Sequence, residues 1–296
     1  MMQRKKIVFY NVPPDMTDIV HYPVLNGFEI TAGKLHINDA DAVIFHMPSM
    51  HRDSDIFLSG VKRPGQIWVF WSNESEMRHR WQYHPEIYDL FDIKASYKLN
   101  ADVSIPYFYA NYFGLLRNEP APKTKFINAL ISGSFNHSGR LEYLKEFMSY
   151  VQVDSFGKMY NNRAIPPGTD KQRLIAPYKF TIAFENAISE DYVTEHFFDP
   201  LIAGSVPIYL GAPNVDDFAP GDKCYIDARS FSSMGELADL LVKLNNDDEA
   251  YMEYLQWKTR PYRLQFNLKA AMVARHPLVK LCMAIGERMT NSEMII

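Results

Sequence analysis

The chain has 296 residues, enough for two domains that each have their own core. Hydrophobic residues make up 47% of it and charged residues 22%, which is typical of a soluble globular protein. A formal net charge of −4 argues against nucleic acid as a bulk electrostatic partner. Two cysteines, Cys224 and Cys282, are too few for a disulfide framework and indicate a reducing compartment.

The amino terminus is basic but passes at once into a strand-like run. It has no apolar core of a signal peptide, and no apolar run in the chain reaches the length of a membrane span. The sequence therefore predicts a cytoplasmic protein.

Short apolar runs alternate with helical patterns along the whole chain. Strands that alternate with helices in this way predict parallel sheets in an α/β fold. The predicted strands are Lys6–Tyr10, Ala42–Phe45, Ile67–Trp71, Phe126–Ile131, Val151–Phe156, Phe180–Phe184 and Val206–Leu210.

A proline-containing stretch between Phe113 and Thr124 interrupts this pattern and predicts a domain boundary. Further on, Ser233 and Glu236 form a capping box before an apolar helical face, and 247–257 predicts another helix. The tail beyond Pro261 also has a helical pattern.

The strand Phe126–Ile131 is followed by a turn rich in glycine and serine, and then by Arg140 at the start of a predicted helix. A fixed guanidinium beside free backbone N–H groups suits a diphosphate. The alternative is that Arg140 pairs with Glu142 or Glu146 on a solvated face.

The segment 178–211 is the most informative part of the chain. It has the pattern of a buried strand, a polar loop, an amphipathic helix, a glycine and a second buried strand. Such a unit places its polar loop at the carboxyl end of a parallel sheet, where open α/β sheets bind ligands. Its loop and helix start offer acceptors for sugar hydroxyls and N–H groups for phosphate.

The runs Phe184-Glu-Asn-Ala, Asp191-Tyr-Val-Thr-Glu-His and Ala203-Gly-Ser-Val-Pro-Ile-Tyr-Leu-Gly resemble the signature of the α1,3-fucosyltransferases, glycosyltransferase family 10. The family usually has serine at the position of Ala187 and lysine at that of His196. A neutral imidazole at 196 lacks the lysine's charge, although a bound diphosphate would raise its pKa. Lys179 or Lys158 is an alternative source of that charge.

The resemblance implies a GT-B arrangement, in which two Rossmann-like α/β domains face a cleft. On this interpretation, 1–115 is the acceptor-binding domain with the general base, 124–265 binds GDP-fucose, and 266–296 is a helical segment that packs back on the protein. The implied activity is inverting transfer of L-fucose from GDP-β-L-fucose to the 3-hydroxyl of a lactose- or N-acetyllactosamine-like acceptor.

The run Arg63-Pro-Gly-Gln-Ile-Trp-Val-Phe-Trp resembles a family segment that ends in Glu-Ser-Pro, whose glutamate is taken as the base. This implies Glu74 as the catalytic base. Glu76 replaces the family's proline and remains open for the same role. Without the resemblance, Glu74 reads as a surface residue in a polar turn.

The same resemblance implies the donor-binding residues. Glu195 corresponds to the ribose-binding carboxylate, and for Asp191 capping of the helix remains as plausible as a ligand contact. The implied donor-binding residues are Arg140, Tyr178, Lys179, Glu185, Asn186, Tyr192, Glu195 and His196.

No obligatory metal or cofactor is expected, and a divalent cation is expected at most to stimulate. Asp39-Ala-Asp41 and Asp53-Ser-Asp55 have the spacing of a metal-binding motif, but two carboxylates at this spacing arise often by chance.

The expected partners are GDP-fucose and an oligosaccharide acceptor. Basic residues of the tail (Lys269, Arg275, Lys280 and Arg288) allow a weak peripheral membrane contact, although packing on the protein is the favoured role of this tail. Two further hypotheses remain open: a GT-B transferase for another nucleotide sugar, and a non-catalytic binder of nucleotides or glycans.

Overall fold

The computed structural model describes residues 4–12, 24–51, 54–58 and 62–293. Its backbone contacts divide the chain into two compact units. Unit 1 comprises Met1–Pro106 and Arg275–Ile296, and unit 2 comprises Tyr107–Ala274. The last helix, α10 (Pro277–Glu293), therefore belongs to unit 1.

Within the described residues, the sheet of unit 1 has seven strands in the order β2-β3-β1-β4-β5-β6-β7. All neighbouring pairs are parallel except β2 with β3. The strands are β1 (Lys6–Asn11), β2 (Val24–Leu25), β3 (Phe28–Ala32), β4 (Ala42–His46), β5 (Ile67–Ser72), β6 (Ile93–Ser96) and β7 (Val103–Ser104).

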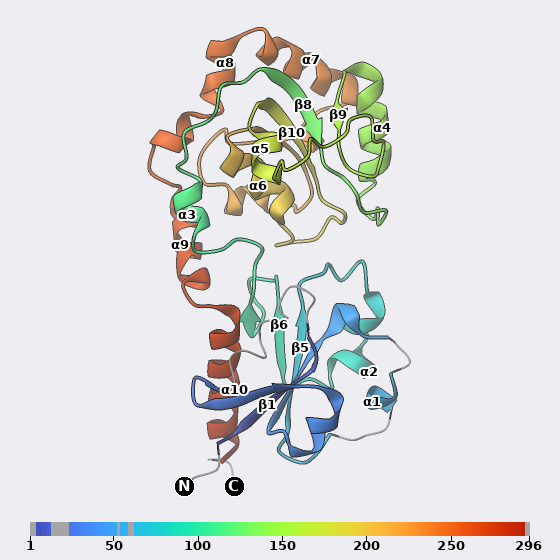
Figure 1. Cartoon of the computed structure of the whole chain (residues 1–296), viewed down its shortest axis with the longest axis vertical. Helices are drawn as coiled ribbons and strands as arrows, with labels where there is room; N and C mark the ends of the chain where they lie inside the picture. Colours follow the sequence, from blue (N-terminus) through green and yellow to red (C-terminus); the bar gives the residue numbers. More distant parts are fainter. Residues whose placement is uncertain (1–3, 13–23, 52–53, 59–61, 294–296) are drawn as a thin grey trace. The chain divides into compact units, whose positions relative to one another are not determined.

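Both faces of this sheet are buried, because successive residues of a strand point to opposite faces. In β5, Trp71 joins a core that includes Leu281 and Ile285 of α10, whereas Phe70 joins the core on the other face. The second face is covered by short helices: α1 (Asp55–Leu58), α2 (Pro85–Tyr88), and the 3₁₀ helices η2 (Lys34–Asp39), η3 (Met47–Ser49) and η4 (Arg80–Tyr83). Figure 1 shows α10 running along the unit 1 sheet.

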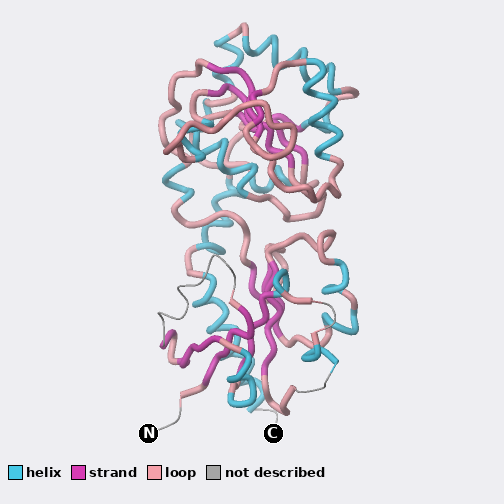
Figure 2. The backbone as a smooth tube through the Cα atoms, turned by 45° about the vertical axis from the view of Figure 1, so that its right-hand side comes forward, coloured by secondary structure: helices cyan, strands magenta, loops and turns pink. Residues whose placement is uncertain are grey.

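The sheet of unit 2 is parallel throughout and has the order β12-β11-β10-β8-β9. Strands lie at the centre of each unit with helices around them (Figure 2). The strands of unit 2 are β8 (Lys125–Ala129), β9 (Asp154–Ser155), β10 (Tyr178–Phe184), β11 (Val206–Leu210) and β12 (Ile226–Asp227).

Helices cover this second sheet on both faces. The apolar faces of α4 (Arg140–Tyr150) and α7 (Met234–Asn245) pack on Phe180, Ile182 and Phe184 of β10. On α6 (Glu195–Ala203), Phe197 packs at 5.2 Å against Tyr209 of β11. The remaining helices are α3 (Tyr112–Leu115), α5 (Lys171–Ile175), η5 (Val215–Phe218), η6 (Ala228–Ser230), α8 (Asp248–Glu253), η7 (Gln256–Thr259) and α9 (Leu264–Val273).

Each unit is thus a Rossmann-like α/β layer structure, and the predicted fold class is confirmed. All seven predicted strands exist, with bounds shifted by up to three residues. The sequence pattern did not predict strands β3 and β6, because polar residues interrupt their short apolar runs. Ser233 caps α7 as expected, but Glu236 accepts from the N–H of Ser232, one residue before the cap.

The predicted tail helix exists, and α10 packs on the sheet of unit 1. Two basic side chains of the tail are engaged within the protein. Lys269 is buried over the ring of Phe218, and Lys280 donates to the carbonyl of Ser104. No helix in the described part of the chain is long and apolar enough to cross a membrane.

Three buried or half-buried cations of unit 2 donate hydrogen bonds to main-chain carbonyls at the carboxyl ends of helices. The ammonium of Lys258 donates to Leu116 O at 2.9 Å after α3, and that of Lys123 donates to Ala176 O at 2.6 Å after α5. Arg117 donates to the carbonyls of Trp257 and Lys258. Cations at helix carboxyl ends satisfy orphan carbonyls and meet the negative end of the helix dipole.

Burial of Lys258 lowers its pKa to about 8, and Arg117 contributes to the same shift. Folding thus penalises the charged ammonium. This cost is present below pH 8 and disappears as the pH approaches the unfolded value near 10.5.

Replacing Lys258 by methionine removes this titration. The free energy of unfolding of wild type, relative to Lys258→Met, should therefore rise by about 2 kcal/mol between pH 7 and pH 10. Denaturant unfolding followed by circular dichroism at the two pH values measures this difference. Lys243→Met, at an exposed position of α7, is the matched control. A pH-independent difference between wild type and Lys258→Met would show that the ammonium is not penalised by burial.

Candidate functional site

The sheet of unit 2 has a topological switch point at β8. The chain passes from β8 to β9 on one side, and then returns to β10 on the other side of β8. Ligands of open α/β sheets bind outside the carboxyl ends of the strands at such a point. The turn after β8 and the loop after β10 meet there, because Ser138 donates through its N–H to Asn186 O and through Oγ to Glu185 O.

Arg140 lies at this switch point as the first residue of α4. Its side chain is 3% exposed, and its guanidinium donates to Phe184 O at 3.1 Å and to Gly133 O at 3.0 Å. The alternative of a surface pair with Glu142 or Glu146 is therefore wrong. These contacts place a buried guanidinium beside the carbonyl that ends β10.

Glu185 is the first residue after β10 and is fully buried. Its two carboxylate oxygens accept from the N–H and the hydroxyl of Thr194, both at 2.7 Å. Burial raises the pKa of Glu185 to about 8, although the bonds from Thr194 act in the opposite direction. The structure thus directs this carboxylate toward the start of α6.

The loop between Glu185 and α6 carries a second pair of mutual hydrogen bonds. Asp191 has a left-handed backbone with φ 66°, and its N–H donates to Asn214 Oδ1 at 2.9 Å. Asn214 Nδ2 donates back to Asp191 Oδ1, also at 2.9 Å. Thr194, and not Asp191, is the cap of α6, so the capping role considered for Asp191 is wrong.

The side chains of Asn186 and Tyr192 differ in their environment. Asn186 Oδ1 is buried and has no hydrogen-bond partner among the described residues. A buried oxygen without a donor is costly to the protein alone, which suggests that a ligand supplies the donor. Tyr192 is buried, and its ring packs edge-on against Tyr107 at 5.8 Å.

Glu195 and His196 begin α6, with side chains 44% and 20% exposed and a separation of 3.9 Å between Glu195 Oε1 and His196 Nε2. Burial lowers the pKa of His196. Glu195 opposes this effect, and the cations Arg140 and Lys171 add to it. At neutral pH His196 is therefore neutral in the free protein.

Tyr178 and Lys179 do not join this group. They begin β10, at the amino edge of the sheet, roughly 20 Å along the strand from Glu185 at ~3.3 Å per residue. The hydroxyl of Tyr178 donates to Asp154 at 2.8 Å, and the ammonium of Lys179 pairs with Asp248 at 2.6 Å. The expected ligand role of these two residues is thus not supported, and both stabilise the fold.

In unit 1, Glu74 follows β5 closely at the carboxyl edge of the sheet. Its Oε1 pairs with Arg78 at 3.0 Å, whereas Oε2 is buried and has no hydrogen-bond partner among the described residues. In contrast, both oxygens of Glu76 have partners within the protein: the carboxylate pairs with Lys98 at 3.1 Å and accepts from the hydroxyl of Tyr97. This geometry favours Glu74 over Glu76 as a base.

The described residues contain no cluster of three or more histidine, cysteine or acidic side chains that could hold a metal ion. In the first of the two Asp-x-Asp motifs, Asp41 accepts from the N–H of Lys6 at 2.7 Å and so supports β1. Of the second motif, Asp53 lies outside the described residues.

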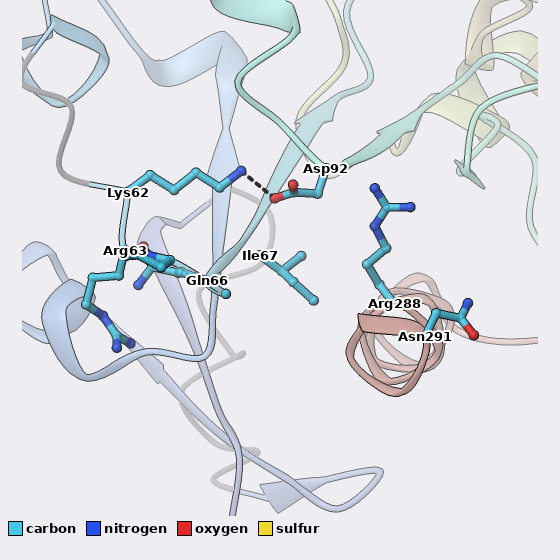
Figure 3. A pocket seen from close by; sticks show the side chains of 9 residues that line it. Lys62, Arg63, Gln66, Ile67, Asp92, Arg288 and Asn291 are labelled. Carbon is cyan, nitrogen blue, oxygen red and sulfur yellow. Dashed lines mark hydrogen bonds and ion pairs between the residues drawn. The ribbon is translucent and has the colours of Figure 1, made fainter. Parts of the chain in front are cut away.

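A cavity of about 580 Å³ in unit 1 is not part of the site. Ile67, in its lining, is the first residue of β5, so the cavity lies at the edge of the sheet opposite Glu74. Figure 3 shows that its cations do not converge, because Lys62 pairs with Asp92 while Arg63 extends away from Arg288.

Sequence reasoning missed three residues that shape the site: Thr194, Lys171 and Asn214. Thr194 stood within the recognised run, and its position before a helical pattern was a capping signal. Lys171 and Asn214 come from other segments, and no local pattern marks them.

Two family models match the chain: "Glycosyltransferase family 10 (fucosyltransferase) C-term" over residues 120–295, and "Fucosyltransferase, N-terminal" over residues 4–108. An Arabidopsis thaliana "Putative fucosyltransferase-like protein" is 32% identical over 78% of this chain and 45% of its own length. The Homo sapiens "GDP-fucose protein O-fucosyltransferase 3" is 29% identical over 79% of this chain and 52% of its own length. The chain thus spans about half the length of these curated relatives.

Among solved structures, an α1,3-fucosyltransferase with GDP-fucose is similar in fold, with a TM-score of 0.66 and 16% identity. The match covers 95% of this chain and 90% of that one. This likeness agrees with the two Rossmann-like domains of the present structure.

Proposed function

The chain belongs to glycosyltransferase family 10, the fucosyltransferases, and on that premise we propose that it transfers L-fucose from GDP-β-L-fucose to an acceptor hydroxyl. One observation carries the proposal. A buried cation, an amide oxygen without a donor and an exposed carboxylate lie on the two loops and helix starts that meet at the switch point of unit 2. Diphosphate, sugar and ribose need these three kinds of group.

In the proposed donor complex, Arg140 stabilises the charge of the diphosphate, which increases as GDP leaves. Glu195 accepts from the ribose 2′- and 3′-hydroxyls, since its carboxylate is the most exposed acid at the start of α6. Asn186 Oδ1 accepts from a hydroxyl of the fucose. Tyr192, whose ring is packed on Tyr107, shapes the loop that carries these groups.

The proposed reaction is a single displacement with inversion. Glu74 Oε2 takes the proton of the acceptor hydroxyl, and the resulting oxygen attacks the anomeric carbon of fucose. The bond from that carbon to the β-phosphate oxygen breaks, and its electron pair leaves with GDP. No step requires a metal, because Arg140 supplies positive charge to the leaving group.

For the acceptor, we propose the 3-hydroxyl of a lactose- or N-acetyllactosamine-like glycan, as the family signature implies. A hydroxyl of a protein is the second candidate. Support for this second candidate comes from relatives named for protein O-fucosylation, which are 28–30% identical to this chain. Labelled GDP-fucose offered to a glycan array and to folded protein acceptors distinguishes the two.

Two other hypotheses arise from Ala187 and His196, where the chain departs from the family signature. A transferase for another nucleotide sugar would bind GDP-mannose or UDP-galactose more tightly than GDP-fucose in isothermal titration. A non-catalytic binder would bind GDP-fucose but yield no product with any acceptor. The unoccupied oxygen of Glu74 favours an enzyme over a binder.

Glu74→Gln should reduce transfer by on the order of 10²–10⁴ because a positioned general base is lost. The Kd of GDP-fucose should stay within a few-fold of wild type, since the base contacts the acceptor and not the nucleotide. Glu76→Gln is the matched control and should retain most activity. A normal rate in Glu74→Gln with loss in Glu76→Gln would assign the base to Glu76.

His196 should make donor binding depend on pH. Its pKa is lowered in the free protein, and a bound diphosphate favours the imidazolium, so binding takes up a proton. The affinity for GDP-fucose should therefore fall as the pH rises from the free-state pKa to the bound-state pKa, and then level off. GDP-fucose is the right probe because it lacks the terminal phosphate of GDP, which titrates near pH 6.

His196→Lys should flatten this dependence and tighten binding near neutral pH, because it supplies a permanent charge. Calorimetric Kd values of both proteins from pH 5 to pH 8 provide the comparison. Identical curves for both proteins would show that position 196 does not face the phosphates.

A further inference from the structure

Glu185 closes a loop at the centre of the site. Its carboxylate reaches forward to Thr194, nine residues later in the chain, and accepts from both the N–H and the hydroxyl of that residue. The segment 186–193, which carries Asn186 and Tyr192, is therefore held at both ends by one side chain.

The backbone and the side chain of Glu185 are also fixed by neighbouring residues. The N–H of Glu185 donates to Leu210 O at 2.7 Å, and its carbonyl accepts from Ser138 Oγ. Gly211 leaves space for its side chain, because a methyl group there would overlap Glu185 Cγ. With no exposed surface, Glu185 has little room to turn toward a ligand.

Thr194 transmits this constraint to the donor-binding residues. It caps α6, and its Oγ also accepts from the N–H of His196 at 3.2 Å. Glu195 and His196 are the first two residues of that helix. The orientation of their side chains therefore depends on where Glu185 holds the cap.

We propose that Glu185 is a positioning residue, which sets the first turn of α6 through Thr194 and does not touch the donor. The statement about the donor rests on the proposed function, whereas the positioning of α6 does not. It replaces the interpretation of Glu185 as a donor-binding residue. In this chain Glu185 thus contacts protein, and through Thr194 it positions Glu195, the carboxylate proposed to bind the ligand.

A double-mutant cycle separates positioning from direct contact. The variants are Glu185→Gln, Thr194→Val and the double variant, and the probe is GDP-fucose in calorimetry. Each single variant should raise the Kd about ten-fold, the value of one hydrogen bond at 1.4 kcal/mol per factor of ten. The double variant should bind no more weakly than Thr194→Val, because Thr194→Val already breaks the hydroxyl contact with Glu185 in addition to the cap bond from the His196 N–H.

Thr194→Ser retains the N–H and the hydroxyl, and should restore binding to near the wild-type value. Multiplicative effects in the double variant would overturn the proposal, since Glu185 would then act independently of Thr194. Lower thermal stability of the single variants with an unchanged Kd would also overturn it. If Glu185→Gln does not fold, the comparison of Thr194→Val with Thr194→Ser still tests the cap.

A readout without ligand keeps the inference distinct from the proposed function. The imidazole NMR signals of His196 in the free protein should move in both Glu185→Gln and Thr194→Val, and the double variant should match Thr194→Val. Thr194→Ser should leave them in place. This pattern, in a protein that does not bind GDP-fucose, would refute the proposed donor and leave the positioning role standing. Unchanged His196 signals in Glu185→Gln would refute the positioning role.

Discussion

A buried guanidinium holds together the ends of two parallel strands, and the candidate donor site depends on this contact. Arg140 begins α4 after β8, and its side chain donates to the carbonyl that ends β10. Ser138 adds bonds to the loop after β10 from the same turn. Since β8 and β10 are neighbours in the sheet, their carboxyl ends already lie at one edge, and these polar contacts fix how the following loops meet there.

The electrostatics of the site follow from placing this cation in a region with little water. Burial disfavours a positive charge at His196, and the cations Arg140 and Lys171 act in the same direction. The free site thus contains a neutral imidazole beside a fixed cation. In the proposed donor complex, a dianionic diphosphate reverses that balance, because it favours the charged imidazolium that the free site disfavours. On the proposed assignment, histidine at position 196 makes donor binding respond to ligand charge in a way that a permanently charged lysine does not.

Much of this arrangement could be predicted from the sequence. Strand β10, helix α6 and strand β11 have apolar periodicities that are clear without a structure, and Arg140 opens a helix whose apolar face is equally clear. The placement of Glu74 after a buried strand was also predictable. These features are local, and local patterns determine secondary structure and the edge of a sheet at which a residue lies.

The predictions that the structure does not support depended on contacts between distant segments or on the end of a strand at which a residue lies. Tyr178 and Lys179 belong to the segment 178–211, but they are the first residues of β10 and so lie at the end of the strand opposite the site. The capping role went to Thr194 because Asp191 is held in a turn by Asn214 from another loop. Periodicity predicted α10 but gave no indication of which sheet it covers.

Hydrogen exchange with and without saturating GDP-fucose tests most directly whether the carboxyl edge of the unit 2 sheet is the donor site. Binding should slow exchange of backbone amides in 131–140 and 185–197, the two segments that meet at the switch point. Amides of 62–67, which line the cavity at the opposite edge of the unit 1 sheet, should be unaffected. Protection confined to segments other than 131–140 and 185–197, or no protection at saturating ligand, would contradict this placement.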